Sequence, residues 1–183
     1  HIESAQKLRE YFEGRDGVIA VVLDGSTVKG NARPDSDIDA IIVVTEEKYA
    51  ELAAQNRLAE VIPGHCTSEG GYFDVNYKTK SILARAAEHA SEPTRNAYVK
   101  AQMLCTTDAE IPALVAAIER YPEHTVDDKI RCFCANLQLN RGYFLHIVPE
   151  DNSIMLDHLT QETVSRLDRL VLHDNALPIT SNA

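Results

Sequence analysis

The sequence predicts an α+β fold in which a small mixed sheet with flanking helices is followed by a helical bundle. Two runs rich in β-branched residues, 18–23 and 40–44, are typical of buried strands. Two further strands are expected at 58–66 and 71–77, because glycine-containing breaks separate these runs. From Thr79 onward the apolar residues recur at helical spacing, which predicts helices to the end of the chain.

Helices are expected before and after these strands. Residues 2–13 place apolar side chains at helical spacing, and Thr45 is a suitable N-cap for a helix that ends near Ala54. Four amphipathic stripes then predict four helices, at 82–90, 111–118, 130–144 and 164–171. We therefore expect a catalytic domain at residues 1–79 and a helical domain at residues 80–183.

Composition narrows the class of protein. The 183 residues are 44% hydrophobic and 25% charged, as in ordinary globular proteins, and the net charge is −10. Without a basic stripe a nucleic-acid partner is disfavoured, whereas a cationic small substrate would suit the charge. No signal peptide or run of 18 apolar residues is present, so no membrane segment is expected.

The cysteines and the two ends of the sequence give further expectations. The four cysteines form no CxxC pair, so we expect them to be reduced and buried in a cytoplasmic protein. The sequence starts at His1 rather than Met, which suggests trimming at that end. The last residues, 176–183, have no convincing helix C-cap, which would fit a truncated end.

The stretch between the first two strands carries the polar residues that indicate a site. Gly25 and Ser26 follow the first strand, where glycine permits a sharp turn and close approach of a ligand. Asp37 and Asp39 begin the second strand and point to one face, about 6.5 Å apart along the chain. Two such carboxylates repel each other unless a cation lies between them, and Mg²⁺ is the hard cation that also brings nucleotide phosphates.

This pattern resembles a known signature. Gly25-Ser26, ten residues and then Asp37-Ile38-Asp39 between two apolar strands is similar to the signature of the polymerase β-type nucleotidyltransferase superfamily. That family places a third carboxylate on a later strand, and Asp74 fits this position. The resemblance covers residues from about 15 to 80. Many minimal members have Arg after Gly-Ser, whereas this chain has Thr27-Val28. This difference leaves open to which branch of the superfamily the chain would belong.

The resemblance implies a reaction and a set of roles. A nucleoside monophosphate is transferred from an NTP, expected to be ATP, to a hydroxyl, and pyrophosphate is released. Asp37, Asp39 and Asp74 would be the catalytic and metal-binding residues for two Mg²⁺ ions, with Asp74 as candidate general base. The Gly25-Ser26 turn would bind the β- and γ-phosphates.

A basic residue is also expected at the triphosphate. Alternation along the strand places Lys78 on the same face as Asp74, so Lys78 is the first candidate and Lys100 the second. A lysine that faces solvent at the strand end is the alternative for Lys78.

The helical half resembles, by architecture alone, the acceptor-side domain of antibiotic nucleotidyltransferases of the aminoglycoside and lincosamide type. We therefore expect the acceptor pocket between the Asp74 face and the helices after Thr79, with a hydroxylated small molecule as acceptor. Acidic candidates for a cationic acceptor are Glu88, Glu92, Asp127 and Asp128, although each of them also fits an ordinary solvated helix charge.

Other functions stay open at this stage. One alternative is an antitoxin-like AMP-transferase that modifies a protein, although such proteins are usually smaller. Another is a non-catalytic nucleotide-binding module, against which the three intact carboxylates argue. The sequence leaves both a monomer and a homodimer open.

Overall fold

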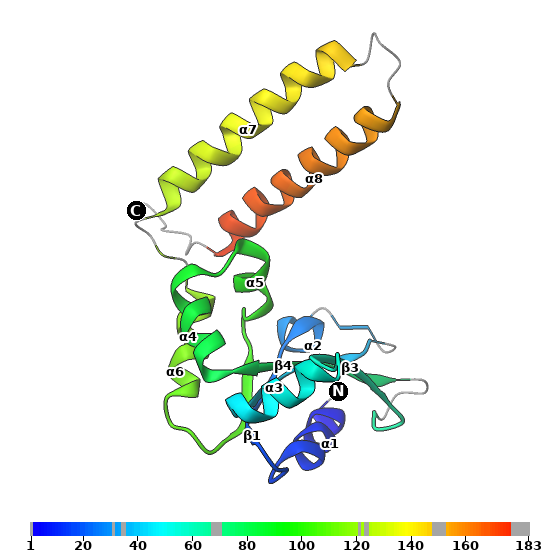
Figure 1. Cartoon of the computed structure of the whole chain (residues 1–183), viewed down its shortest axis with the longest axis vertical. Helices are drawn as coiled ribbons and strands as arrows, with labels where there is room; N and C mark the ends of the chain where they lie inside the picture. Colours follow the sequence, from blue (N-terminus) through cyan, green and yellow to red (C-terminus); the bar gives the residue numbers. More distant parts are fainter. Residues whose placement is uncertain are drawn as a thin grey trace. The chain divides into compact units, whose positions relative to one another are not determined.

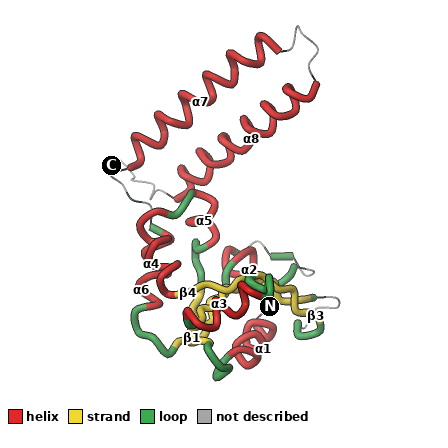
Figure 2. The backbone as a smooth tube through the Cα atoms, in the orientation of Figure 1, coloured by secondary structure: helices red, strands yellow, loops and turns green. Residues whose placement is uncertain are grey.

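The computed structural model describes residues 2–30, 32–33, 36–66, 71–120, 122, 125–147 and 153–176. The chain divides into two compact units, His1–Arg120 and Tyr121–Ala183 (Figures 1 and 2).

The first unit is built on a mixed sheet of five strands in the order β3-β4-β2-β1-β5. The strands are β1 (Val18–Leu23), β2 (Ile38–Val44), β3 (Ala59–Pro63), β4 (Tyr72–Thr79) and β5 (Gln102–Thr106). β1 pairs antiparallel with β2 and β5, β3 pairs antiparallel with β4, and β2 pairs parallel with β4. The parallel register sets Asp39 opposite Asp74.

Helices α1 (Ile2–Phe12) and α3 (Glu46–Ala54) cover one face of this sheet. Leu8, Phe12 and Leu52 from these helices are buried together with alternate residues of the strands. This first core takes Ile38, Ala40, Ile42 and Val44 from β2, and Phe73, Val75 and Tyr77 from β4. Thr45 caps α3 as expected, because its side chain accepts a hydrogen bond from the Lys48 N–H.

Helices α4 (Lys80–His89), α5 (Glu92–Ala97) and α6 (Ile111–Glu119) cover the other face. The second core joins Leu83 of α4, Tyr98 after α5 and three residues of α6 to the remaining strand residues. These strand residues are Ala20, Val22, Ile41 and Val43. The sheet therefore lies between two helical layers, and the helices after Thr79 pack on the face that carries Asp39 and Asp74.

A buried arginine joins the three helices of this second layer. Arg95 is only 1% exposed. Its Nη1 donates hydrogen bonds to the carbonyl oxygens of Ile118 (3.0 Å) and Arg120 (2.7 Å), at the end of α6. Its Nη2 donates to the carbonyls of Ala87 (3.4 Å) and Glu88 (3.3 Å), near the end of α4. The guanidinium thus satisfies carbonyls that helix ends leave without partners, and its charge suits the negative ends of two helices.

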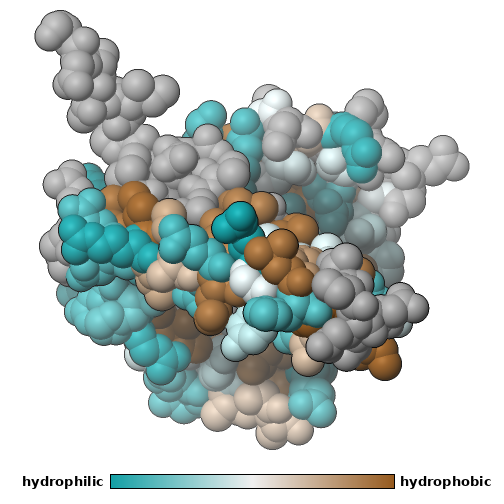
Figure 3. Space-filling model, turned by 90° about the horizontal axis from the view of Figure 1, so that it is seen from above, coloured by the Kyte–Doolittle hydropathy of each residue, from teal (hydrophilic) through white to brown (hydrophobic). Residues whose placement is uncertain are grey.

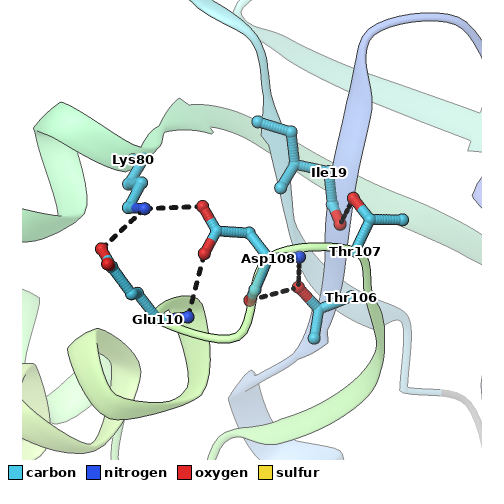
Figure 4. A network of polar contacts seen from close by, with 6 residues as sticks. All are labelled: Ile19, Lys80, Thr106, Thr107, Asp108 and Glu110. Carbon is cyan, nitrogen blue, oxygen red and sulfur yellow. Dashed lines mark hydrogen bonds and ion pairs between the residues drawn. The ribbon is translucent and has the colours of Figure 1, made fainter.

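A second polar network ties the start of α4 to the turn after β5 (Figure 4). The Lys80 ammonium contacts Asp108 Oδ2 at 2.6 Å and Glu110 Oε2 at 2.7 Å. Asp108 Oδ1 accepts the Glu110 N–H at 2.9 Å, so the carboxylate also orders the start of α6. Because Lys80 is partly exposed, we expect this network to fix geometry more than to add stability.

The second unit is an antiparallel pair of long helices, α7 (Val126–Ile147) and α8 (Ser153–Ala176) (Figure 1). Asn140 of α7 donates a hydrogen bond to the Thr163 hydroxyl of α8 at 3.1 Å. Several large apolar side chains of the pair stay exposed, among them Leu139, Leu145 and Ile154. Figure 3 shows the surface of the chain from above, where hydrophobic and hydrophilic residues lie side by side. Within the described ranges, no helix is long and apolar enough to cross a membrane.

The α+β class, with a mixed sheet, flanking helices and a helical C-terminal region, is confirmed. The expectation that the chain stays helical after Thr79 is wrong, because β5 returns to the sheet beside β1 and α5 precedes it. α4 to α6 therefore belong to the first compact unit. The proposed functional division at residue 79 stays a prediction.

The expectation for the cysteines is confirmed only in part. All four cysteines are free, but none of them is fully buried: Cys66 and Cys105 are partly buried, and Cys132 and Cys134 on α7 are exposed. The expected ending of the chain after residue 176 lies outside the described residues.

Removing the Arg95 guanidinium should loosen the second helical layer. We expect Arg95→Met to lower the local free energy of unfolding of α4 and α6 by about 2–4 kcal/mol, because buried carbonyls lose their donors. Hydrogen–deuterium exchange of peptides from α4 and α6 measures this change. Arg85→Met, at an exposed position of α4, is the control and should stay within about 0.5 kcal/mol. Equal exchange in both variants would contradict the role of Arg95.

Candidate metal and nucleotide site

Three carboxylates converge where β2 and β4 begin. Their neighbours Ile38, Ala40, Phe73 and Val75 all belong to the first core, so Asp39 and Asp74 point to the opposite face. One carboxylate oxygen from each of Asp37, Asp39 and Asp74 lies within 4.8 Å of the others. The structure therefore brings together the three acidic residues that the sequence pattern selected.

The turn after β1 is shaped around Asp39. Gly25 has φ +71°, and a methyl group at its Cα would overlap the Asp39 carboxylate. The Ser26 backbone N–H donates a hydrogen bond to that carboxylate, and the Asp24 N–H donates to the Asp39 carbonyl at 3.1 Å. Glycine is needed here both for its positive φ and for its missing side chain. Gly25 and Ser26, which begin α2 (Gly25–Lys29), thus hold a carboxylate in place.

Negative charge accumulates in this group. Burial, followed by the charges of Asp37 and Asp74, raises the pKa of Asp39 above its usual value. A cation would relieve both effects, because it favours the charged form. Carboxylate oxygens are the ligands that hard divalent ions such as Mg²⁺ prefer, so the donor set fits such an ion.

A fourth carboxyl group lies beside these three, and the sequence analysis did not select it. Asp24 directly follows β1, next to Asp39, and is only 9% exposed. Within the described part of the chain, its Oδ1 has no hydrogen-bond partner. Burial, followed by the charge of Asp39, raises the pKa of Asp24 to about 7. The charge of Asp24 in turn adds to the effect of burial in raising the pKa of Tyr98, whose ring lies in the second core.

Lys29 is a basic residue of this site that sequence reasoning also missed. Burial and the acidic neighbours raise the pKa of both Asp24 and Asp39, and the positive charge of Lys29 acts in the opposite direction on both. Lys29 follows Gly25 by four residues in α2, so both lie on the same side of one helical turn. Gly25 abuts Asp39, and this spacing explains why the Lys29 side chain is close to the carboxylates.

The two lysines selected from the sequence lie elsewhere. Lys78 is on the Asp74 face of β4, but it pairs with Val43 in register, four residues beyond Asp74 and therefore about 13 Å along the strand. Lys100 follows α5 with φ +59°, and its backbone N–H donates to Glu119 Oε1 at 3.2 Å. The contact of either lysine with a triphosphate stays a prediction.

The acidic acceptor candidates differ in their surroundings. Glu88 is exposed and approaches His89 at 3.4 Å, whereas Glu92 is only 5% exposed at the start of α5. Asp127 and Asp128 belong to α7 of the second unit, so they stay candidates from the sequence alone.

Tyr72 is a further side chain of the site that the sequence analysis left unassigned. It is the first residue of β4 and lies two positions before Asp74, on the same face. Its hydroxyl forms a hydrogen bond with the Asp37 carboxylate, and this bond, followed by the Asp37 charge, raises the pKa of Tyr72.

Comparison with known proteins agrees with this geometry for the first part of the chain. Residues 5–93 match the family model of the nucleotidyltransferase domain. This segment contains all four carboxyl groups, Gly25 and Lys29. The match supports nucleotide transfer in general. Among curated proteins, none matches the sequence.

A solved structure shows a distant likeness. The chain is similar to a nucleotidyltransferase-like protein from Exiguobacterium sibiricum 255-15, with a TM-score of 0.48 and 10% sequence identity. The alignment covers 99% of this chain and 60% of that protein, so the chain spans less than two thirds of the length of this neighbour.

The buried Asp24 predicts a pH-dependent stability. The pKa of this carboxyl group is about 7 in the folded protein and 3.8 ordinarily, so folding favours its protonated form. The contribution of Asp24 to the free energy of unfolding is therefore greatest below about pH 4, and it is lost as the pH rises to about 7. We expect Asp24→Asn to be more stable than the unaltered protein at pH 8, by up to about 4 kcal/mol, and similar at pH 4.

Urea unfolding at several pH values, without divalent cations and with tyrosine fluorescence as the signal, measures the difference. Asp16→Asn, at an exposed position before β1, is the control and should follow the unaltered protein. Parallel stability curves for Asp24→Asn and the unaltered protein would show that Asp24 does not titrate in this range.

Proposed function

We propose that this protein transfers a nucleoside monophosphate from an NTP to a hydroxyl group of a small molecule and releases pyrophosphate. The observation that carries the proposal is the group of three carboxylates, with oxygens within 4.8 Å of one another, inside the segment that matches a nucleotidyltransferase domain. ATP is the proposed nucleotide.

Asp37, Asp39 and Asp74 are the proposed ligands of two Mg²⁺ ions. Bound there, the ions would neutralise charge on the attacking and leaving oxygens of the displacement. The contribution of the chain is to hold the carboxylates in place: the parallel register aligns Asp39 with Asp74, and the Ser26 N–H orients Asp39. Positioning and charge neutralisation account for most of the catalysis in such transfers.

Asp74 is the proposed general base. It lies on β4, beyond Asp39 from the Gly25-Ser26 turn, so an acceptor hydroxyl would approach from its side. A base must lie within hydrogen-bond reach of the proton that it accepts, and a partly exposed carboxylate at the start of a strand allows this.

The triphosphate would lie on the β1 side of the carboxylates. Gly25 and Ser26 are the proposed contacts for the β- and γ-phosphates, with a lysine as the compensating charge. Lys29 is close enough to influence Asp24 and Asp39, whereas Lys78 lies further along β4. We therefore rank Lys29 before Lys78.

The proposal also names the class of acceptor, the parts of the chain that bind it, and the oligomeric state. A cationic, hydroxylated small molecule of the antibiotic type would suit the net charge of −10. Residues 1–79 would supply catalysis and residues 80–183 the acceptor side, in a cytoplasmic monomer or homodimer.

The test of the function is a transfer assay. The protein is incubated with each NTP, Mg²⁺ and a panel of aminoglycosides, lincosamides and other hydroxylated acceptors, and pyrophosphate is measured. Release that depends on both an NTP and one acceptor class supports the proposal. An NTP that binds with Mg²⁺ but is never cleaved would instead favour a nucleotide-binding module.

Loss of one metal ligand should abolish transfer. We expect Asp37→Asn to lower kcat/KM by a factor of about 100 or more, because several kcal/mol of transition-state charge stabilisation are lost. Steady-state pyrophosphate release measures the change. Asp157→Asn, exposed on α8, should keep its activity. Turnover of Asp37→Asn near that of the unaltered protein would mean that the carboxylate group is structural.

The two candidate lysines can be separated by kinetics. We expect Lys29→Met to raise the KM for NTP or to lower kcat by about tenfold, the loss of one charge-assisted contact, and Lys78→Met to do so less. Thermal stability should change little in both. Lys7→Met, on the surface of α1, is the control. A larger effect at Lys78 than at Lys29 would reverse the ranking.

A further inference from the structure

A cavity of about 490 Å³ lies between α1, α2 and the first residues of β5. Leu23, Val28 and Leu104 line it, and these residues belong to the first core or pack against it, so the cavity is on the α1 side of the sheet. Asp39 and Asp74 extend from the other face. Small-molecule sites usually have volumes of about 300–1,000 Å³ and mostly apolar walls. The cavity is therefore large enough for a small organic ligand and is separate from the carboxylates.

The charge of this cavity disfavours an anion as its ligand. Among the described residues that line it, Arg9 alone is charged. Its Nε and Nη2 donate hydrogen bonds to the two carboxylate oxygens of Glu13, both at 2.9 Å. A phosphate or carboxylate would meet Glu13 together with Arg9 and would lack a cation of its own. The ligand is therefore expected to be uncharged.

Two glutamine side chains supply hydrogen-bonding groups to the cavity. Gln6 donates from Nε2 to Glu10 at 3.1 Å, which leaves its carbonyl oxygen as an acceptor. Within the described part of the chain, the amide of Gln102 has no hydrogen bond, so both its oxygen and its nitrogen are available to a ligand. Such an amide matches the N6 and N7 edge of adenine, because its oxygen accepts from the amino group and its nitrogen donates to N7.

A threonine of α2 adds an unsatisfied polar atom to the wall. The Thr27 hydroxyl oxygen is buried, and among the described residues it has no hydrogen-bond partner. Threonine in a helix adopts either of two rotamers, so rotation about χ1 can turn this hydroxyl toward the cavity. A ligand that forms a hydrogen bond with it removes the cost of a buried polar atom without a partner.

α2 links the cavity to the carboxylates. Thr27 and Val28 line the cavity, and Gly25 of the same five-residue helix abuts the Asp39 carboxylate. A ligand that contacts Thr27 and Val28 therefore restricts the motion of the helix that begins with the Gly25-Ser26 turn.

We propose that this cavity binds an uncharged adenine nucleoside, and that the bound nucleoside stiffens α2. Gln102 binds the adenine edge, the apolar wall contacts the ring, and the Thr27 hydroxyl bonds to the ligand. The site goes beyond the proposed transfer, because its ligand carries no phosphate and is not consumed.

The test is the equilibrium binding of adenosine to the full chain, measured by isothermal titration calorimetry without Mg²⁺ and without NTP. Inosine is the matched ligand, because it carries a carbonyl oxygen where adenosine has the amino group. We expect adenosine to bind about tenfold more tightly than inosine, the usual effect of one two-bond contact to a base. Equal affinities for the two, or no saturation below about 1 mM, would overturn the proposal.

Variants assign the binding to this cavity. Gln102→Met removes the amide from an exposed position of β5 and should lower the affinity for adenosine about tenfold. Thr27→Val keeps the shape of the side chain and should also weaken binding, without loss of thermal stability, because the hydroxyl has no partner to lose. Gln138→Met, exposed on α7, is the control. Unchanged affinity in both cavity variants would place the binding elsewhere and overturn the inference.

Hydrogen–deuterium exchange tests the effect on α2. Saturating adenosine should slow the exchange of peptides that cover residues 23–30 and leave those of α3 unchanged. The protection should be weaker in Gln102→Met at the same adenosine concentration. Adenosine that binds without slowing exchange in α2 would overturn the link between the cavity and this helix.

These outcomes are independent of the proposed function. Binding is measured without NTP and without Mg²⁺, so it succeeds or fails whether or not pyrophosphate is released in the transfer assay. Absence of adenosine binding leaves the proposed function intact, and absence of transfer leaves the cavity and its ligand intact.

Discussion

Mutual repulsion among carboxyl groups is the constraint on which the arrangement of this protein depends. Asp39 and Asp74 lie on the adjacent strands β2 and β4, Asp24 directly follows the neighbouring strand β1, and Asp37 adds a fourth carboxyl group just before β2. The strand register and the two cores hold these groups together at a cost in free energy, which is visible in the raised pKa values of Asp24 and Asp39. A fold that tolerates such a cost is prepared for a cation, because binding relieves the repulsion.

Part of the site could be predicted from the sequence because it depends on local rules. Alternation along a strand places Asp37 and Asp39 on one face, and Gly25 marks a position where a side chain has no room. Lys29 and Tyr72 could not be predicted in the same way. Their roles depend on how α2 packs on β2 and on which carboxylate a hydroxyl meets, and these contacts join residues far apart in the chain.

The fold shows the same division between local and distant information. The first strands and the long helices follow from periodicity, which each segment carries within itself. β5 was missed because its five residues, QMLCT, show no clear apolar alternation. They form a strand by pairing with β1, which is distant in the sequence. α5 was missed because its six residues, EPTRNA, carry no apolar periodicity, although the proline in its first turn is well suited to the start of a helix.

The position of β5 decides where this chain can be divided. It pairs with β1, whose residues Val21 and Val22 are fully buried. In the sequence it comes after α4 and α5, which connect β4 to β5. A fragment that stops at residue 93, where the family match ends, would lack β5 and turn β1 into an exposed apolar edge. Such edges pair with other chains and cause aggregation. The smallest part of this chain that stays soluble on its own should therefore extend beyond Thr106.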